Sequence, residues 1–88
     1  MTKHLRDTVI AALDNAAGVL NVPDFARRLM GGQDLELARI EMDSMTMMEV
    51  IMHLEAELGF DIEADEISGQ ATVNGLIDHL QKRLDVVV

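Results

Sequence analysis

The chain of 88 residues contains no cysteine, tryptophan or tyrosine, and it has two phenylalanines, Phe25 and Phe60. Without cysteine, it can form no disulfide or thiolate metal site, and it supplies no thiol nucleophile of its own. The core must therefore be aliphatic, built from leucine, isoleucine, valine, methionine and alanine. Because a chain of this length buries one modest core, we expect a single domain over residues 1–88.

Long apolar runs are also missing. None approaches the roughly 20 residues that span a bilayer. The first residues, MTKHLRDT, are too polar for the apolar segment of a signal peptide. We therefore expect a soluble, cytoplasmic protein that does not insert into membranes.

Positive charge is absent from residues 40–81, which hold ten acidic residues and no lysine or arginine, in a chain of formal net charge −9. Such a region repels nucleic acid and anionic lipid and attracts basic protein surfaces. The alternative is that the negative surface only keeps the protein in solution. We expect no nucleic-acid partner and a monomeric protein.

Apolar residues recur at the spacing of a helix face in three long segments, residues 3–18, 44–58 and 72–84. Residues 63–68 permit one short helix. No strand pattern competes. The sequence therefore predicts an all-α fold, a small four-helix bundle of three longer helices and one short one. Its first two long helices are joined by a long loop, residues 19–43, in which a short helix can form over 23–30.

Several residues indicate where these helices end. Thr2 and Thr72 can cap the first and last of them, and Gly59 can terminate the helix over 44–58. Lys82 and Arg83 are expected in the last turn of the final helix, where positive charge is favourable. Residues 85–88 are expected to fray.

Ser44 stands at the head of a methionine-rich helix, DSMTMMEVIMHLEAELGF, residues 43–60. Asp43 or Ser44 can be its N-cap, and the serine would then only satisfy a backbone N–H. The same position can hold a phosphate ester, because a helix N-terminus presents free N–H groups to an anion. The charge of Asp43 opposes this, so an outside enzyme would have to drive the attachment.

Ser44 makes a poor catalytic nucleophile, because no G-x-S-x-G motif surrounds it and the three histidines are scattered. A calcium loop over DIEADEISG is not favoured, since Glu66 replaces the required glycine and Thr72 the bidentate glutamate. No H-x-x-x-H pair suggests zinc. We expect no catalytic residues and no metal site, and His53 is most simply a solvated residue.

Met45, Met48 and Met52 fall at the flank of the apolar face of this helix, with Glu49 between them. They either fill a core short of aromatic rings or form an adaptable binding surface. An apolar patch flanked by acid suits the docking of basic enzymes with apolar centres.

DSM, followed by MMEVIMHLEAELGFDI, resembles the signature of acyl carrier proteins and their peptidyl-carrier relatives, with a glutamate five residues after the serine. ATVNGLIDHL resembles the closing helix of that family, and the similarity covers about residues 37–80. The resemblance implies a four-helix bundle in which Ser44 carries phosphopantetheine through a phosphodiester. A separate phosphopantetheinyl transferase would attach it from coenzyme A with magnesium.

The resemblance further implies a carrier that is not itself an enzyme. It would hold an acyl or aminoacyl group as a thioester and present it to loading and transferring enzymes with basic docking surfaces. Position by position, Ser44 is the attachment site and Asp43 its flanking acid. The partner-binding face would comprise Met45, Glu49 and Met52, extended by Glu55 and Glu57.

Three departures from the family pattern suggest a specialised carrier. Glu41 stands where the family usually has glycine, and Ile62 and Glu63 replace a Val/Ile-Pro pair. The loop contains PDFARRLMGG. Its arginines, Arg27 and Arg28, either contact a dedicated partner together with Arg39 or balance acids within the bundle.

Two other interpretations remain at this stage. In one, the chain is an unmodified acidic helical module that binds peptides with its Met-rich surface. In the other, Ser44 is phosphorylated for signalling. The chain does not reveal which cargo a carrier would hold.

Overall fold

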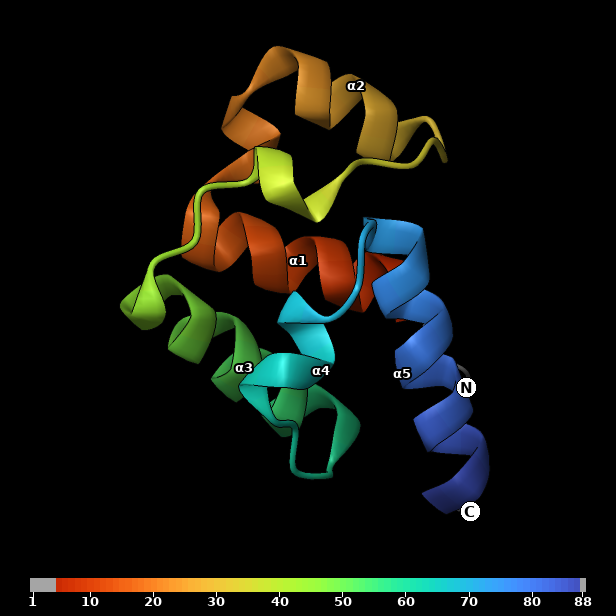
Figure 1. Cartoon of the computed structure of the whole chain (residues 1–88). Coiled ribbons are helices and arrows are strands. Elements are labelled where there is room, and N and C mark those ends of the chain that lie inside the picture. Colours follow the sequence, from red (N-terminus) through yellow and green to blue (C-terminus); the bar gives the residue numbers. More distant parts are fainter. Residues whose placement is uncertain (1–4, 88) are drawn as a thin grey trace.

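The computed structural model describes residues 5–87, with the side chains of residues 5–86. The fold is all-α, as predicted, and the helices form a small bundle (Figure 1). The elements are α1 (Leu5–Ala17), α2 (Pro23–Met30), α3 (Ser44–Leu58), α4 (Ala64–Ser68) and α5 (Val73–Val87), with 3-10 turns at Val19–Asn21 and Leu37–Arg39. Thr2 and the predicted helix start at residue 3 lie outside the described residues.

Glycine and proline set the helix ends on either side of the first connection. α1 stops where Gly18 adopts a left-handed conformation, with φ of 66°, which a residue without Cβ adopts at little cost. The Gly18 N–H still donates to the carbonyl of Asp14 at 2.8 Å. α2 begins at Pro23, whose missing N–H costs nothing in the first turn of a helix.

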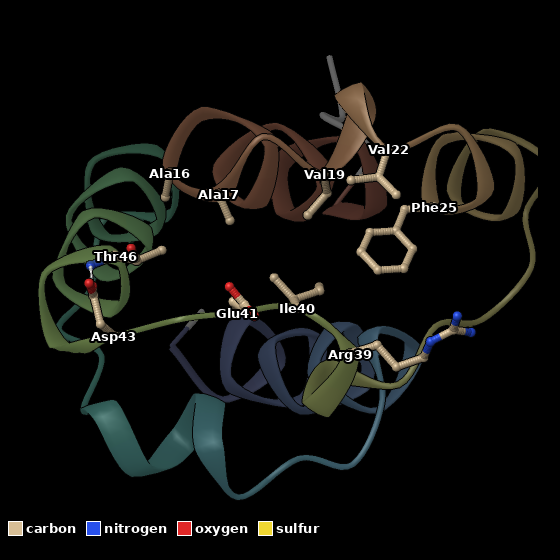
Figure 2. Close-up of a pocket in the computed structure, with 10 residues that line it drawn as sticks. All are labelled: Ala16, Ala17, Val19, Val22, Phe25, Arg39, Ile40, Glu41, Asp43 and Thr46. Atoms are coloured by element: carbon tan, nitrogen blue, oxygen red, sulfur yellow. Dashed lines mark hydrogen bonds between the residues drawn. The ribbon is translucent and has the colours of Figure 1, made fainter.

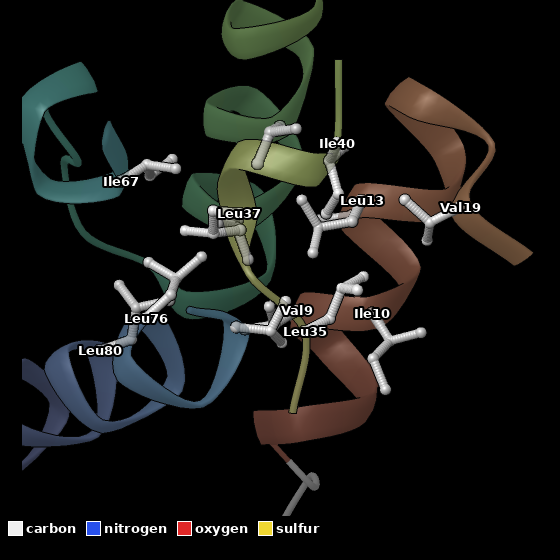
Figure 3. Packing of buried hydrophobic residues seen from close by; sticks show 14 of the residues in the cluster. Val9, Ile10, Leu13, Val19, Leu35, Leu37, Ile40, Ile67, Leu76 and Leu80 are labelled. Atoms are coloured by element: carbon white, nitrogen blue, oxygen red, sulfur yellow. The ribbon is translucent and has the colours of Figure 1, made fainter. Parts of the chain in front are cut away.

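The segment between α2 and α3 is attached to the start of α5. The N–H of Leu37 donates to the carbonyl of Ala71 at 3.0 Å, and the N–H of Val73 donates to that of Leu35 at 2.8 Å. Leu35, Leu37 and Ile40 are buried in the core (Figure 3). This long connection is therefore fixed against the bundle up to the residue before Glu41.

The core is aliphatic and draws on every helix. Its fully buried side chains include Val9 and Leu13 of α1, Leu54 of α3, and Leu76 of α5. Figure 3 shows residues of α1, α4, α5 and the 35–40 segment converging on one cluster. The partly buried Phe25 and Phe60 pack against the edge of this cluster.

Arg6 links three elements. Its Nη1 donates to Asn74 Oδ1 at 2.7 Å, and its Nη2 donates to the carbonyls of Leu29 at 3.1 Å and Gln33 at 2.8 Å. Beside it, Asp34 Oδ1 accepts the N–H groups of Leu35 at 2.8 Å and Asn74 at 2.9 Å. Partial burial raises the pKa of Asp34, but these hydrogen bonds outweigh it and hold that pKa below its ordinary value.

The end of the bundle corrects two expectations. α5 continues to Val87, three residues beyond the expected end of this helix, and Lys82 and Arg83 therefore do not lie in its last turn. Arg83 instead bonds across the bundle. Its Nη1 donates to Glu66 at 2.8 Å and to the carbonyl of Asp61 at 2.7 Å. The guanidinium also lies 4.3 Å from the centre of the Phe60 ring.

Glu66 joins α4 to α5 through this cluster. It accepts the N–H of Glu63 at 2.8 Å and contacts His79 Nε2 at 2.9 Å and Arg83. Burial raises its pKa, but the hydrogen bonds from Glu63, His79 and Arg83 and the positive charge of Arg83 lower it, with a net pKa of about 2. Because the folded-state pKa lies below the unfolded one, this stabilisation is present above about pH 4.5 and is lost toward pH 2.

Glu66→Gln is therefore expected to destabilise the protein more at pH 7 than at pH 3. Glutamine can still accept the Glu63 N–H but cannot gain from ionisation. The difference in unfolding free energy between the two proteins should fall to less than roughly half between these pH values. Urea unfolding at both pH values measures it. A difference that does not change with pH would contradict the role given to this carboxylate.

Candidate functional site

Ser44 is the first residue of α3, and Asp43 precedes it as the N-cap. Asp43 Oδ1 accepts a hydrogen bond from the N–H of Thr46 at 2.8 Å. This bond satisfies one of the backbone N–H groups in the first turn that have no partner within the helix. The structure thus assigns the capping role to Asp43 and not to Ser44. Within residues 5–86 the exposed Ser44 hydroxyl has no hydrogen-bond partner, so it is open to chemistry supplied from outside.

The site suits a covalent phosphate ester better than a free anion. The hydrogen bond from the Thr46 N–H lowers the pKa of Asp43, so a full negative charge stands beside Ser44. Glu41, also exposed, adds another. Both carboxylates repel a free phosphate in solution. An ester at the exposed Ser44 would be held by its bond and solvated by water.

Three methionines form a surface patch on α3 that begins at the residue after Ser44. Met45 is 74% exposed, Met48 56% and Met52 62%. We refer to these three residues as the methionine patch. Glu49 is exposed among them, whereas Val50, Ile51 and Leu54 of the same helix are buried. The methionines therefore do not fill the core, and the adaptable binding surface is the alternative that their exposure allows.

A pocket of about 640 Å³ opens beside the same helix start (Figure 2). Asp43 and Thr46 lie at one end, and Phe25 and Arg39 at the other. Its walls come from the end of α1, the turn at Val19–Asn21, the start of α2 and the segment 39–43. The apolar part of the lining is Ala16, Ala17, Val19, Val22, Phe25 and Ile40.

The family model described as "Phosphopantetheine attachment site" matches residues 12–80, most of the chain. The chain belongs to this carrier family. The match includes Ser44, the methionine patch and the residues that line the pocket. A search of curated proteins and a search of solved structures found no match.

Carrier domains of this family hold phosphopantetheine covalently and receive it from a phosphopantetheinyl transferase. The resemblance to acyl and peptidyl carriers noted in the sequence is thereby confirmed. Among the described residues of this carrier, no group of three His, Asp or Glu side chains is placed to hold a metal ion. Nor is any described helix long and apolar enough to cross a bilayer.

Two residues of α3 in this carrier have surroundings that the sequence did not predict. Glu55 is half-buried, and its Oε2 accepts the N–H of Ile62 at 2.8 Å. It therefore fixes the turn between α3 and α4, a role inside the fold that the sequence did not predict. His53 is half-buried beside α1 residues such as Asp14, not freely solvated. The helical period places both correctly along α3 but cannot show what packs against them.

The assignment of Asp43 as the cap of α3 predicts the behaviour of two variants. In Asp43→Ala the Thr46 N–H loses its partner, and its hydrogen exchange should become faster. Asp43→Asn keeps an acceptor oxygen and is an equally good cap, so exchange at Thr46 should stay close to that of the wild-type carrier. Amide exchange by NMR measures this. Equal exchange in both variants would show that the cap does not control the start of α3.

Proposed function

We propose that this carrier holds an acyl or aminoacyl group as a thioester on a phosphopantetheine arm attached to Ser44, and that it presents this cargo to enzymes of a biosynthetic pathway. The observation that carries the proposal is the exposed Ser44 hydroxyl without a partner, one residue after a cap that satisfies the helix. Because Asp43 does the capping, Ser44 has no structural task that modification would disturb.

In the attachment reaction, Ser44 supplies the nucleophilic oxygen and the transferase supplies the catalytic groups. The Ser44 oxygen would bond to the β-phosphorus of coenzyme A, and adenosine 3′,5′-bisphosphate would leave. The hydroxyl proton would pass to a base of the transferase. Among the described residues no side chain hydrogen-bonds this hydroxyl, so none is already engaged with it as that base. Once attached, the arm ends in a thiol that forms the thioester.

The methionine patch and Glu49 support docking to basic enzymes with apolar centres. Flexible methionine side chains can adapt to several partner surfaces. The acidic residue among them would pair with lysine or arginine of the partner and steer its approach. α3 carries three glutamates and no arginine or lysine, so the electrostatic field over this helix is negative.

Glu49→Lys is expected to slow loading by the transferase and acyl transfer by partner enzymes by about tenfold, the effect of about 1.4 kcal/mol in binding. Helicity should not change, because the side chain is exposed. The matched control is Asp78→Lys, the same charge reversal at an exposed position of α5. Rates of mass gain on a fixed amount of transferase compare the two. An equal slowing in both variants would mean that net charge matters and the α3 surface does not.

A specialised carrier fits the residues that depart from the family pattern. Glu41 adds an acid next to the attachment site, and α2 brings Arg27 and Arg28 to the surface. Both arginines contact Asp24, Arg28 at 3.3 Å. These ion pairs favour the interpretation that the arginines balance charge within the bundle. Exposed Arg27, 75% accessible, remains available to a partner as well.

Intact mass spectrometry tests the proposal. The purified protein is incubated with coenzyme A, magnesium and a phosphopantetheinyl transferase of broad specificity. We expect a gain of one phosphopantetheine per chain. A folded protein that gains nothing would favour the unmodified interaction module. A serine that carries bare phosphate in protein from its own cells would favour signalling, and the mass distinguishes the two.

A further inference from the structure

The pocket beside Ser44 has opposite charge at its two ends. Asp43 lies at the end near the serine, and Arg39 lies at the far end, beyond Phe25 (Figure 2). Glu41 lies between, on the side of Asp43. Apolar wall residues such as Val19 and Ile40 line the space between the charged ends. A ligand in this pocket is therefore oriented by its own charge, since an anionic group is repelled at the near end and attracted at the far one.

Arg39 is the group that can bind such an anion. Its Nη2 is 3.7 Å from Asp24 Oδ2, too long for a hydrogen bond, and its guanidinium lies 5.6 Å from the centre of the Phe25 ring. Within residues 5–86 this guanidinium makes no hydrogen bond. The fork geometry of arginine matches a carboxylate in a bidentate pair, which is shorter and stronger than a neutral hydrogen bond.

Asp24 does not neutralise this end of the pocket. Arg27 and Arg28 already contact its carboxylate, so three guanidinium groups face a single acid. The far end is therefore positive in a protein whose formal net charge is −9. The side chain of Arg39 is 45% exposed, so the interaction with an anion is moderated by water and depends on the ligand being held nearby.

We propose that this pocket receives the end of the carrier's own arm, and that Arg39 selects acyl cargo with a carboxylate at its far end, the half-thioester of a dicarboxylic acid. The inference rests on the proposed attachment at Ser44. An uncharged acyl chain of the same length contacts the same apolar wall but gains nothing from Arg39. Tethering makes the weak contact effective, because the cargo is always at high local concentration.

The phosphopantetheine arm is long enough to bring its cargo to Arg39. Residues 39–44 are joined by five peptide units, which span at most about 18 Å when extended. A phosphopantetheine arm has about 14 bonds between the serine oxygen and the sulfur, or about 17 Å at ordinary bond lengths. An arm that follows this segment therefore brings its sulfur near the backbone of Arg39, and the acyl chain beyond the sulfur then runs alongside the Arg39 side chain, so that its far carboxylate can reach the guanidinium.

The test compares two cargoes of six carbons, adipyl and hexanoyl, on the ¹⁵N-labelled holo-carrier. Intact mass first establishes that each sample is fully loaded. Adipyl is expected to shift the NMR signals of the Arg39 side-chain Nε–H and the Ile40 amide, and hexanoyl is expected to leave the Arg39 signal in place. In Arg39→Gln the adipyl and hexanoyl spectra should become alike at Ile40. The control Lys82→Gln, which removes an exposed positive charge outside the pocket lining, should keep the difference.

Several outcomes of this comparison would overturn the proposal. If adipyl and hexanoyl give the same spectra in the wild-type carrier, or if Arg39→Gln leaves their difference intact, Arg39 does not select the cargo. If loaded carriers show shifts only on the methionine patch, the pocket does not hold the arm. A chain that takes up no arm overturns the attachment at Ser44 and this proposal with it, whereas a loaded chain with an unresponsive pocket overturns this proposal alone.

Discussion

A carrier in which Ser44 is replaced by alanine is expected to take up no phosphopantetheine at all, with no loss of fold. The loss should be complete because the bond is made to one oxygen atom, and alanine has none. The fold should persist because Asp43, not Ser44, caps α3, and the Ser44 side chain is exposed. Intact mass after incubation with coenzyme A and transferase measures the first effect, and circular dichroism measures the second.

Ser68→Ala is the matched control, since the chain contains two serines and Ser68 is also exposed at a helix end. It should gain one arm at the wild-type rate. Uptake by Ser44→Ala would place the attachment elsewhere. If Ser44→Ala failed to fold, the serine would have a structural task that its exposed position does not show.

Arg6→Met is expected to give the largest loss of stability among single changes of a polar residue, about 2–3 kcal/mol in the free energy of unfolding. Three charge-assisted hydrogen bonds end on Asn74, Leu29 and Gln33, and their acceptors lie at the meeting point of α1, α2 and α5. Methionine keeps a comparable apolar stem. It also removes the buried Arg6 Nε, which lacks a hydrogen-bond partner among the described residues. Removing this unsatisfied donor is favourable and offsets a small part of the loss in stability.

Urea unfolding followed by circular dichroism measures the effect, and the melting temperature should fall by roughly 10 °C or more. Arg27→Met is the control, because Arg27 is exposed and contacts only Asp24 in the ion pairs of α2. Its effect should be within about 0.5 kcal/mol of zero. A stability of Arg6→Met equal to that of Arg27→Met would mean that the links from Arg6 do not hold the three elements together.

Features that depend only on residues close in the sequence could be predicted. Pro23 indicated where α2 begins, Gly59 where α3 ends, and the period of apolar residues predicted which face of α3 enters the core. These features arise from backbone geometry and side-chain spacing, both of which are local. The anchoring of the long connection by Leu35, Leu37 and Ile40 was also predictable, because isolated apolar residues in a polar segment need a core to pack against.

Contacts between elements distant in the sequence could not be predicted. Glu55 and Arg83 looked like surface residues of their helices, but each bonds a segment that the fold brings beside it, Glu55 to Ile62 and Arg83 to Glu66 and Asp61. The pocket is of the same kind, since its lining residues come from five segments that no periodicity brings together. Even at Ser44 the sequence left the capping role open, because Asp43 and Ser44 are equally good caps.

The most direct test of the account is tandem mass spectrometry of the carrier purified from its own cells. Digestion after acidic residues releases a short peptide that contains Ser44. We expect this peptide to carry one phosphopantetheine, with fragment ions that assign it to Ser44, and the acyl group still bound to its sulfur would identify the cargo. An unmodified Ser44 in the carrier that is active in those cells would contradict the account.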